Sequence, residues 1–167
     1  RPNNPEPPLP CPSFSPPGQR IAVAHDIAFG FSYEHIMNGW RRAGAEILPF
    51  SPLADDAVRE DADFIYLPGG YPELHLPKLS TATSFHNSLK QAAIRGCPIY
   101  GECGGFMTLG RAICDADGNR WPMAGLLDLT TSFAAPKRTL GYRFLTAETG
   151  PFTGSWTGHE YHVTKAI

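Results

Sequence analysis

The chain lacks the features that most simply signal a nucleic-acid-binding or a membrane protein. Its 167 residues include 14 Lys and Arg against 16 Asp and Glu, the net charge is −2, and the basic residues form no run. A near-neutral chain without a basic patch is not expected to bind nucleic acid. Its longest apolar runs are far shorter than the ~20 residues that span a bilayer, so the sequence predicts no membrane partner.

Closely spaced cysteines are also missing. The four cysteines, Cys11, Cys97, Cys103 and Cys114, include no CxxC pair, so we predict no metal site. An even number of cysteines would allow disulfides, but a chain of this length with 42% apolar residues can build a core without them. We therefore expect reduced thiols and a cytoplasmic protein.

Proline, by contrast, is concentrated at the N-terminus, where residues 1–20 contain eight prolines and few apolar residues. This composition is typical of an extended linker rather than a folded element. We therefore predict an interdomain linker over residues 1–19 and one folded domain over residues 20–167. The linker also predicts that a further domain lies upstream.

Short apolar runs alternate with helical patterns through the middle of the chain. Strands are predicted at 21–24, 46–50, 64–67 and 98–100, helices at 33–43, 83–95 and 106–109, and a partly helical connector at 51–61. This alternation predicts an α/β fold, a flavodoxin-like three-layer sandwich with helices on both faces of a mainly parallel central sheet. From residue 121 onward, β-branched and aromatic residues among turn residues predict appended antiparallel strands, at 127–129 and 140–145.

The motif Gly-Glu-Cys-Gly-Gly at residues 101–105 follows a predicted strand and precedes a predicted helix. Glycines allow tight backbone dihedrals and close approach of a substrate, so this pattern is typical of a nucleophile on a sharp strand-to-helix turn. Free cysteines are often structural core residues. The surrounding glycines nevertheless favour a catalytic role for Cys103.

Two histidines near the C-terminus are candidates for a general base, because a cysteine followed far downstream by a histidine is the order expected of a Cys-His pair. His159 and His162 are three residues apart, so on a strand they would point to opposite faces and only one could face the site. Residue chemistry leaves the choice between them open. Glu160 would share a face with His162, where it could orient the imidazole or remain a solvated charge.

A second glycine turn, Pro-Gly-Gly-Tyr-Pro-Glu at residues 68–73, ends the preceding predicted strand. Because functional sites of parallel sheets form at the carboxyl ends of their strands, this turn should lie on the same edge as Cys103. The amides of Gly70 and Tyr71, together with that of Gly104, are predicted to bind an oxyanion. A plain glycine turn is the alternative. Residues 138–143 contain two arginines, and we favour a plain hairpin there over a contact with an anionic substrate or a partner.

Together, the PGGYPE turn, the GECGG motif, the RTLGYR segment at 138–143 and the GHEYH segment at 158–162 resemble the glutamine amidotransferase domain of cobyrinic and hydrogenobyrinic acid a,c-diamide synthases. The resemblance covers residues 20–162, in the family's order. It implies glutamine as the substrate, Cys103 as the nucleophile that forms a thioester, and His162 rather than His159 as the catalytic histidine. Many related amidotransferases have a glutamate two residues after this histidine, where this chain has Thr164, so the third member of a triad stays open.

The same resemblance implies that the released ammonia serves an ATP-dependent synthetase domain. The sequence contains no GxxxxGK[ST] motif, so that domain is expected to precede this chain and to hold the ATP and Mg²⁺, with no cofactor in the chain itself. There the a and c carboxylates of a corrinoid would be amidated, with or without cobalt in the ring. The resemblance also predicts that the chain is truncated at its C-terminus, because family members usually continue past the histidine segment.

Three alternatives stay open. The amidotransferase domain of cobyric acid synthase shares the cysteine and the histidine, but the residues of its motifs differ. Another cysteine-dependent hydrolase or peptidase on a similar sheet would not release ammonia specifically from glutamine. A catalytically silent domain of amidotransferase type, which only docks a partner, would not depend on Cys103.

Overall fold

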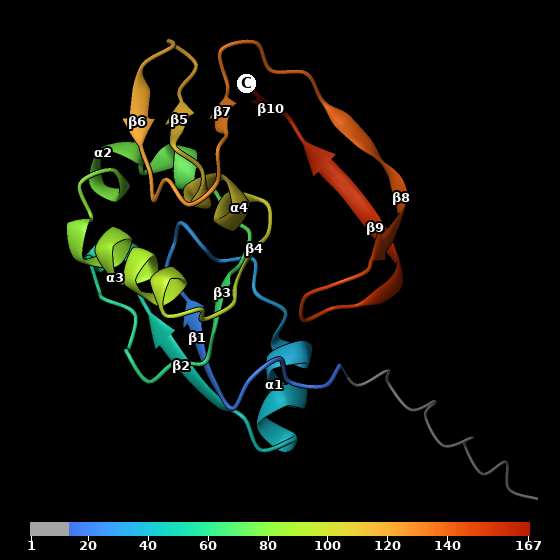
Figure 1. The fold of residues 1–167 in the computed structure, drawn as a ribbon. Helices are drawn as coiled ribbons and strands as arrows, with labels where there is room; N and C mark the ends of the chain where they lie inside the picture. The colour runs from blue at the N-terminus through green and yellow to red at the C-terminus, as the bar shows by residue number, and fades with distance from the viewer. Residues whose placement is uncertain (1–13) are drawn as a thin grey trace, which may run out of the picture.

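The structure, a computed structural model, describes residues 14–167 (Figure 1). Its centre is a sheet in the order β2-β1-β3-β4, made of β1 (Arg20–Ala24), β2 (Glu46–Phe50), β3 (Phe64–Leu67) and β4 (Ile99–Gly101). The three strand pairs of this sheet are all parallel. The parallel central sheet predicted from the alternation of strands and helices is therefore confirmed.

The central strands are apolar along their whole length because both faces of the sheet are covered. Every residue of β3 is buried, as expected for a parallel strand between two layers of helices. Successive residues of β1 serve opposite faces. Ile21 packs with Trp40 of α1 (Glu34–Arg42) in one core, whereas Ala22 belongs to the larger core on the other face.

The helices begin and end close to their predicted positions. Helix α1 ends before Gly44, which has a φ of 95°, and α3 (Thr83–Ile94) ends before Gly96, which has a φ of 78°. Glycine adopts such left-handed conformations without strain, which suits it to the end of a helix. Residues of α3 pack in the larger core, opposite α1, so the three-layer arrangement is confirmed. The short α4 (Gly104–Leu109) starts directly after Cys103.

Three short elements complete the body of the domain. The partly helical connector contains one of them, the 3₁₀ helix η1 (Pro52–Ala54). After β3, the chain forms a second 3₁₀ helix, η2 (Pro72–Leu74), and the single-turn helix α2 (Leu76–Leu79), neither of which the sequence pattern predicted.

The remaining strands form two further sheets. Four of them pair in the order β10-β7-β5-β6, and the other two form the β8–β9 hairpin. Their bounds are β5 (Ala112–Cys114), β6 (Arg120–Pro122), β7 (Thr130–Ser132), β8 (Thr139–Ala147), β9 (Gly154–His162) and β10 (Lys165–Ala166). Figure 1 shows the hairpin as a long arm beside the body of the domain. The antiparallel strands expected late in the chain are present, including the one predicted at 140–145, which lies within β8.

The strand predicted at 127–129 was wrong. The amides of Leu126 and Leu127 both donate to the carbonyl of Leu109 at the end of α4, at 2.9 Å, and the two leucine side chains pack against the larger core. This segment is therefore a turn against α4, and the strand, β7, begins only at Thr130. β7 also pairs parallel with β5 rather than antiparallel.

Most of the predicted linker lies outside the described residues, since it includes residues 1–13 and with them Cys11. Residues 14–19 carry no helix or strand, and Phe14 stacks on Trp156 of β9 with ring centroids 5.3 Å apart. The three cysteines within the described range are free thiols. Between residues 14 and 167, no helix has both the length and the apolar character needed to cross a membrane.

Candidate active site

Cys103 occupies a sharp turn between β4 and α4. Its φ of 48° and ψ of −114° form a combination that residues with a side chain rarely adopt, because it brings Cβ close to the neighbouring backbone. Two backbone bonds hold the turn: the amide of Glu102 donates to the carbonyl of Leu67 at 3.1 Å, and the amide of Gly105 donates to the carbonyl of Glu102 at 2.8 Å. The thiol-bearing residue is exposed, so the strand–turn–helix geometry presents Cys103 to solvent.

Glycine is required around Cys103 because atoms of β3 and of η2 lie so close. A Cβ on Gly105 would lie 2.0 Å from the carbonyl oxygen of Leu67, and one on Gly104 would lie 2.7 Å from Cδ of Pro72. A Cβ on Gly69 would lie 3.2 Å from Cβ of Cys103. The turn after β3 and the turn after β4 are therefore in direct contact, on the edge of the sheet where the sequence placed them.

The three predicted oxyanion donors lie on these two turns. Among the hydrogen bonds between residues 14 and 167, none uses the amide of Gly70 or Tyr71. Gly104 is the first residue of α4, where an amide has no acceptor within its own helix. Gly70 and Tyr71 line the same cavity as Cys103, whereas Gly104 is not among its lining residues. The amides of Gly70 and Tyr71 are thus free to bind a ligand beside the cysteine.

That cavity, of about 540 Å³, lies between the body of the domain and the end of the hairpin. The body contributes Cys103 and residues of η2, α4 and β7, and the hairpin contributes His159, Glu160 and His162. The fold thus brings the predicted nucleophile and both candidate histidines, far apart in sequence, to one cavity.

The hairpin register places the two histidines on opposite faces, as predicted. The expectation that only one of them could face the site was wrong, because both line the cavity. His162 is paired with Thr139 and His159 with Tyr142, and paired residues of an antiparallel hairpin share a face. His159 lies edge-on to Tyr142, with centroids 5.5 Å apart, on the face opposite His162. Both line the cavity because it lies at the end of the hairpin.

His162 is held at both ring nitrogens. Its Nε2 lies 2.7 Å from Oε1 of Glu160, and its Nδ1 lies 3.0 Å from the carbonyl oxygen of Thr164. Glu160 also forms an ion pair with Arg143 of β8. The hydrogen bond to His162 and the nearby Arg143 guanidinium lower the pKa of Glu160 below its ordinary value. Of the two interpretations of Glu160, the geometry therefore favours the one in which it orients the imidazole.

These contacts also limit what His162 can do without rearrangement. A carboxylate and a carbonyl oxygen only accept hydrogen bonds, and the two ring nitrogens of His162 lie against these two groups rather than against Cys103. Among the described residues, the Cys103 sulfur makes no hydrogen bond, either with His162 or with another group. His162 could accept the Cys103 proton only after one of its two contacts breaks.

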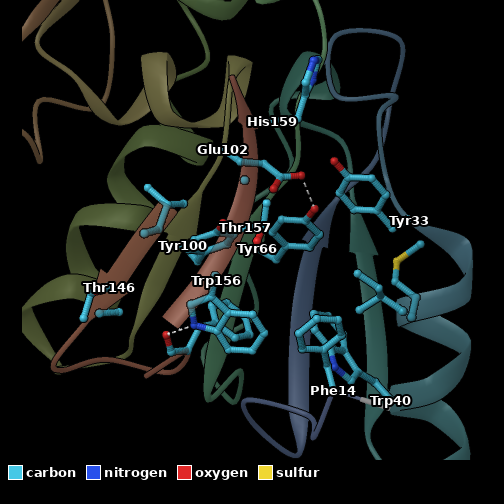
Figure 2. Close-up of a pocket in the computed structure, with 16 residues that line it drawn as sticks. Phe14, Tyr33, Trp40, Tyr66, Tyr100, Glu102, Thr146, Trp156, Thr157 and His159 are labelled. Atoms are coloured by element: carbon cyan, nitrogen blue, oxygen red, sulfur yellow. Dashed lines mark hydrogen bonds between the residues drawn. The ribbon is translucent and has the colours of Figure 1, made fainter. Parts of the chain in front are cut away.

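A second cavity, of about 690 Å³, lies between α1, the sheet and the hairpin (Figure 2). Seven aromatic residues line it, and the one carboxylate among its described lining residues is Glu102. Glu102 accepts a hydrogen bond of 2.6 Å from the hydroxyl of Tyr66. Burial raises the pKa of Glu102, and the Glu102 charge in turn raises the pKa of Tyr33. His159 lines this cavity as well as the one that contains Cys103.

Two polar residues that line the Cys103 cavity, Glu73 and Thr131, were not among the predicted site residues. Glu73 stands in the PGGYPE motif itself, and its place directly after the glycine turn was a usable signal. Thr131 lies in β7, which has only three residues. This pattern is too short to predict from the sequence which side chains of the strand face inward.

A parallel α/β sheet with an exposed cysteine on a strained strand-to-helix turn is the arrangement of α/β enzymes that use a cysteine nucleophile. The chain belongs to the CobB/CobQ-like glutamine amidotransferase domain family, whose model matches residues 20–167.

The names of similar relatives agree with this assignment, and a solved structure supports the fold. The chain is 55% identical over 153 residues to a hydrogenobyrinate a,c-diamide synthase of Sinorhizobium sp, covering 91% of the chain and 35% of the relative. It is 53% identical over 156 residues to the protein of that name from Rhizobium meliloti (strain 1021), covering 93% of the chain and 36% of the relative. A crystal structure of a glutamine amidotransferase matches with a TM-score of 0.52 at 14% identity, covering 84% of this chain and 70% of that one, which supports the fold.

The chain spans little more than a third of the length of these relatives. Most of each relative therefore lies outside the matched region, as expected if the amidotransferase domain is one part of a larger enzyme.

Proposed function

We propose that this chain hydrolyses glutamine and supplies the ammonia to an ATP-dependent synthetase domain that amidates a corrinoid. The observation that carries the proposal is the strained Cys103 turn, beside free amides and a cavity of about 540 Å³, in a chain of the CobB/CobQ-like glutamine amidotransferase domain family.

In the proposed reaction, the general base takes the Cys103 proton, and the sulfur attacks the γ-amide carbon of glutamine to form a tetrahedral intermediate. The amides of Gly70 and Tyr71, with that of Gly104, stabilise its oxyanion. The carbon–nitrogen bond then breaks, ammonia leaves with a proton from the general base, and a thioester remains on Cys103. Water hydrolyses the thioester to glutamate and restores the thiol.

His162 is our candidate for the general base. The Glu160 carboxylate that it contacts is ionised and paired with Arg143, an arrangement that can orient an imidazole and stabilise its charged form. In this role His162 gives up its contact with the Thr164 carbonyl, and Nδ1 turns toward Cys103. His159, on the opposite face but at the same cavity, is the competing candidate.

Our proposal that the ammonia is used to amidate a corrinoid rests on the names of the relatives, which are hydrogenobyrinate a,c-diamide synthases. ATP and Mg²⁺ belong in this proposal to the further domain. Within residues 14–167 there is no group of three or more His, Cys, Asp or Glu suited to a metal ion, and the sequence has no GxxxxGK[ST] motif. We assign the reaction to the cytoplasm, since Cys97, Cys103 and Cys114 are free thiols.

The first test is labelling of the full-length protein with 6-diazo-5-oxo-norleucine, a glutamine analogue that alkylates an activated cysteine, followed by mapping with mass spectrometry. We expect one adduct, on Cys103, that excess glutamine prevents; Cys97 and Cys114 serve as internal controls. Cys103→Ala should abolish both the labelling and the ammonia release from glutamine. A folded protein without the adduct would contradict the proposal and favour a silent docking domain. Release of ammonia without preference for glutamine would favour another hydrolase.

The second test separates the two histidines. His162→Gln and His159→Gln are compared in the full-length protein by ammonia release and by alkylation of Cys103. We expect His162→Gln to lower the rate ~10²- to 10⁴-fold, the usual contribution of a general base, and His159→Gln to change it far less. If neither variant slows the reaction, the base lies outside this chain or at another residue, and the assignment of His162 is wrong.

A further inference from the structure

One carboxylate oxygen in the Cys103 cavity has no partner. Glu73 lies in η2, directly after the turn that carries Gly70 and Tyr71, and η2 contacts α4 beside Cys103. Its Oε2 is shielded from solvent and makes no hydrogen bond with any residue in the described part of the chain. A buried carboxylate oxygen without a partner is costly, so such a group commonly marks a place where a ligand binds.

The charges around the cavity show what kind of ligand group would fit. Two carboxylates, Glu73 and Glu160, line it, and its described lining includes no lysine or arginine. Glu160 is already paired with Arg143 and His162. Burial raises the pKa of Glu73, and His75, outside the cavity lining, is the neighbour whose charge opposes this. The cavity therefore has an unbalanced carboxylate that a cationic group would neutralise.

A second polar atom in the same cavity is also without a partner. Thr131 of β7 is 3% exposed, and its backbone is fixed by pairing with Ile113 and Ala166. Its Oγ1 is buried and makes no hydrogen bond among residues 14–167. Thr131 lines the cavity, and its hydroxyl has no partner among the described residues that a ligand would have to displace. A hydroxyl can accept a hydrogen bond from an ammonium group, which donates three.

We propose that Glu73, assisted by the Thr131 hydroxyl, binds the positively charged α-amino group of the amino acid whose side-chain amide reacts at Cys103. This inference rests on the proposed glutaminase function and adds how the substrate is recognised. The turn after β3 would then act twice: Gly70 and Tyr71 bind the oxygen of the reacting amide, and Glu73 binds the other end of the same molecule. The site would select an α-amino acid amide over a simple amide.

The experiment compares L-glutamine with glutaramate, which has the same side-chain amide and carboxylate but no α-amino group, in the full-length protein. Glu73→Gln keeps the shape of the side chain and removes its charge. We expect this variant to raise KM for glutamine roughly 10- to 100-fold, the range for losing a hydrogen bond to a charged group, while kcat/KM for glutaramate stays unchanged. Thr131→Val should raise KM for glutamine by roughly 2- to 10-fold, and the exposed Glu60→Gln is the matched control.

The ratio of the two substrates decides the outcome. A Glu73→Gln variant that loses activity toward both substrates equally would mean that Glu73 only supports the turn, and a variant that loses neither would mean that it does not contact the substrate; either result overturns the inference. Failure of the proposed function looks different, because it shows in the wild-type protein: ammonia is released from neither substrate and Cys103 does not react with 6-diazo-5-oxo-norleucine, or ammonia is released without preference for glutamine.

Discussion

The Cys103 turn and the β8–β9 hairpin border the same cavity but are held by different means. Around Cys103, the backbone lies against β3, whose residues are all buried, and a Cβ on Gly105 would overlap the Leu67 carbonyl. Along the hairpin, every residue of β8 and β9 is at least partly exposed. The nucleophile is therefore positioned by the core, whereas the candidate base is positioned mainly by contacts within its own hairpin.

This difference has a practical consequence. A mutation at the turn changes both the packing of the domain and the geometry of the site, because the same residues belong to both. A mutation at an exposed position of β8 or β9 removes no buried side chain and changes mainly how the histidines are presented. Substitutions in the two regions should therefore separate in their effects on the free energy of unfolding.

The largest effect is expected for Gly105→Ala. The new Cβ would lie 2.0 Å from the Leu67 carbonyl oxygen and 2.6 Å from its carbon, and neither backbone atom can move without disturbing β3. We expect a loss of more than ~3 kcal/mol in the free energy of unfolding, or failure to fold, measured by urea denaturation. Gly39→Ala is the control, because Gly39 lies within α1 with no atom near its Cβ position, and it should gain ~0.5–1 kcal/mol. Equal stability of the two variants would contradict the role of the close approach.

A smaller loss is expected for Tyr66→Phe, which removes the hydroxyl that donates to Glu102 at 2.6 Å. The Glu102 carboxylate would remain in its cavity without this donor, so the free energy of unfolding should fall by roughly 1–3 kcal/mol near neutral pH. Tyr100→Phe is the matched control, because Tyr100 stacks on Tyr66 and its hydroxyl has no hydrogen bond among the described residues. Equal losses in both variants would show that ring packing, not the hydrogen bond, is being measured.

The pH dependence of stability tests the same carboxylate. Burial raises the pKa of Glu102 above its ordinary value of 4.5, so the folded chain holds this proton more tightly than the unfolded chain. The resulting stabilisation is complete below pH 4.5 and is lost as the pH rises through the raised pKa. Urea denaturation should therefore show wild type losing stability relative to Glu102→Gln as the pH increases to neutral. A constant difference between the two proteins would mean that Glu102 is not perturbed by burial.

In the hairpin, Arg143→Gln should hardly change stability but should change the reaction. The Arg143–Glu160 pair is partly exposed, and exposed ion pairs contribute little, so its loss should hardly change the free energy of unfolding. Without the guanidinium, the pKa of Glu160 rises toward its ordinary value, and the acidic limb of glutamine hydrolysis should shift to higher pH. Arg42→Gln, at an exposed position of α1, is the control. An unchanged pH profile would mean that Glu160 does not act through His162.

The sequence could predict some parts of this fold but not others. The four central strands and their helices were predictable, because a sheet covered on both faces produces apolar runs and because glycines mark the turns at residues 69–70 and 101–105. The second sheet was not, since β5, β6 and β7 have three residues each and their pairing depends on the packing of leucines against α4. The sequence could not predict that side-chain atoms of Glu73 and Thr131 lack hydrogen-bond partners among the described residues, because this depends on which atoms surround them in the fold.

The smallest effect is expected for Phe144→Ser in the hairpin. Phe144 is 93% exposed, so its replacement removes almost no buried surface and should change the free energy of unfolding by less than about 0.5 kcal/mol. The same substitution in the body, Phe64→Ser, removes a fully buried ring and should cost about 3–5 kcal/mol or more. Urea denaturation of both variants measures the contrast between the two regions with one chemical change. A large loss for Phe144→Ser would mean that the hairpin is packed against the body through this face, and the division drawn between the two regions would then be wrong.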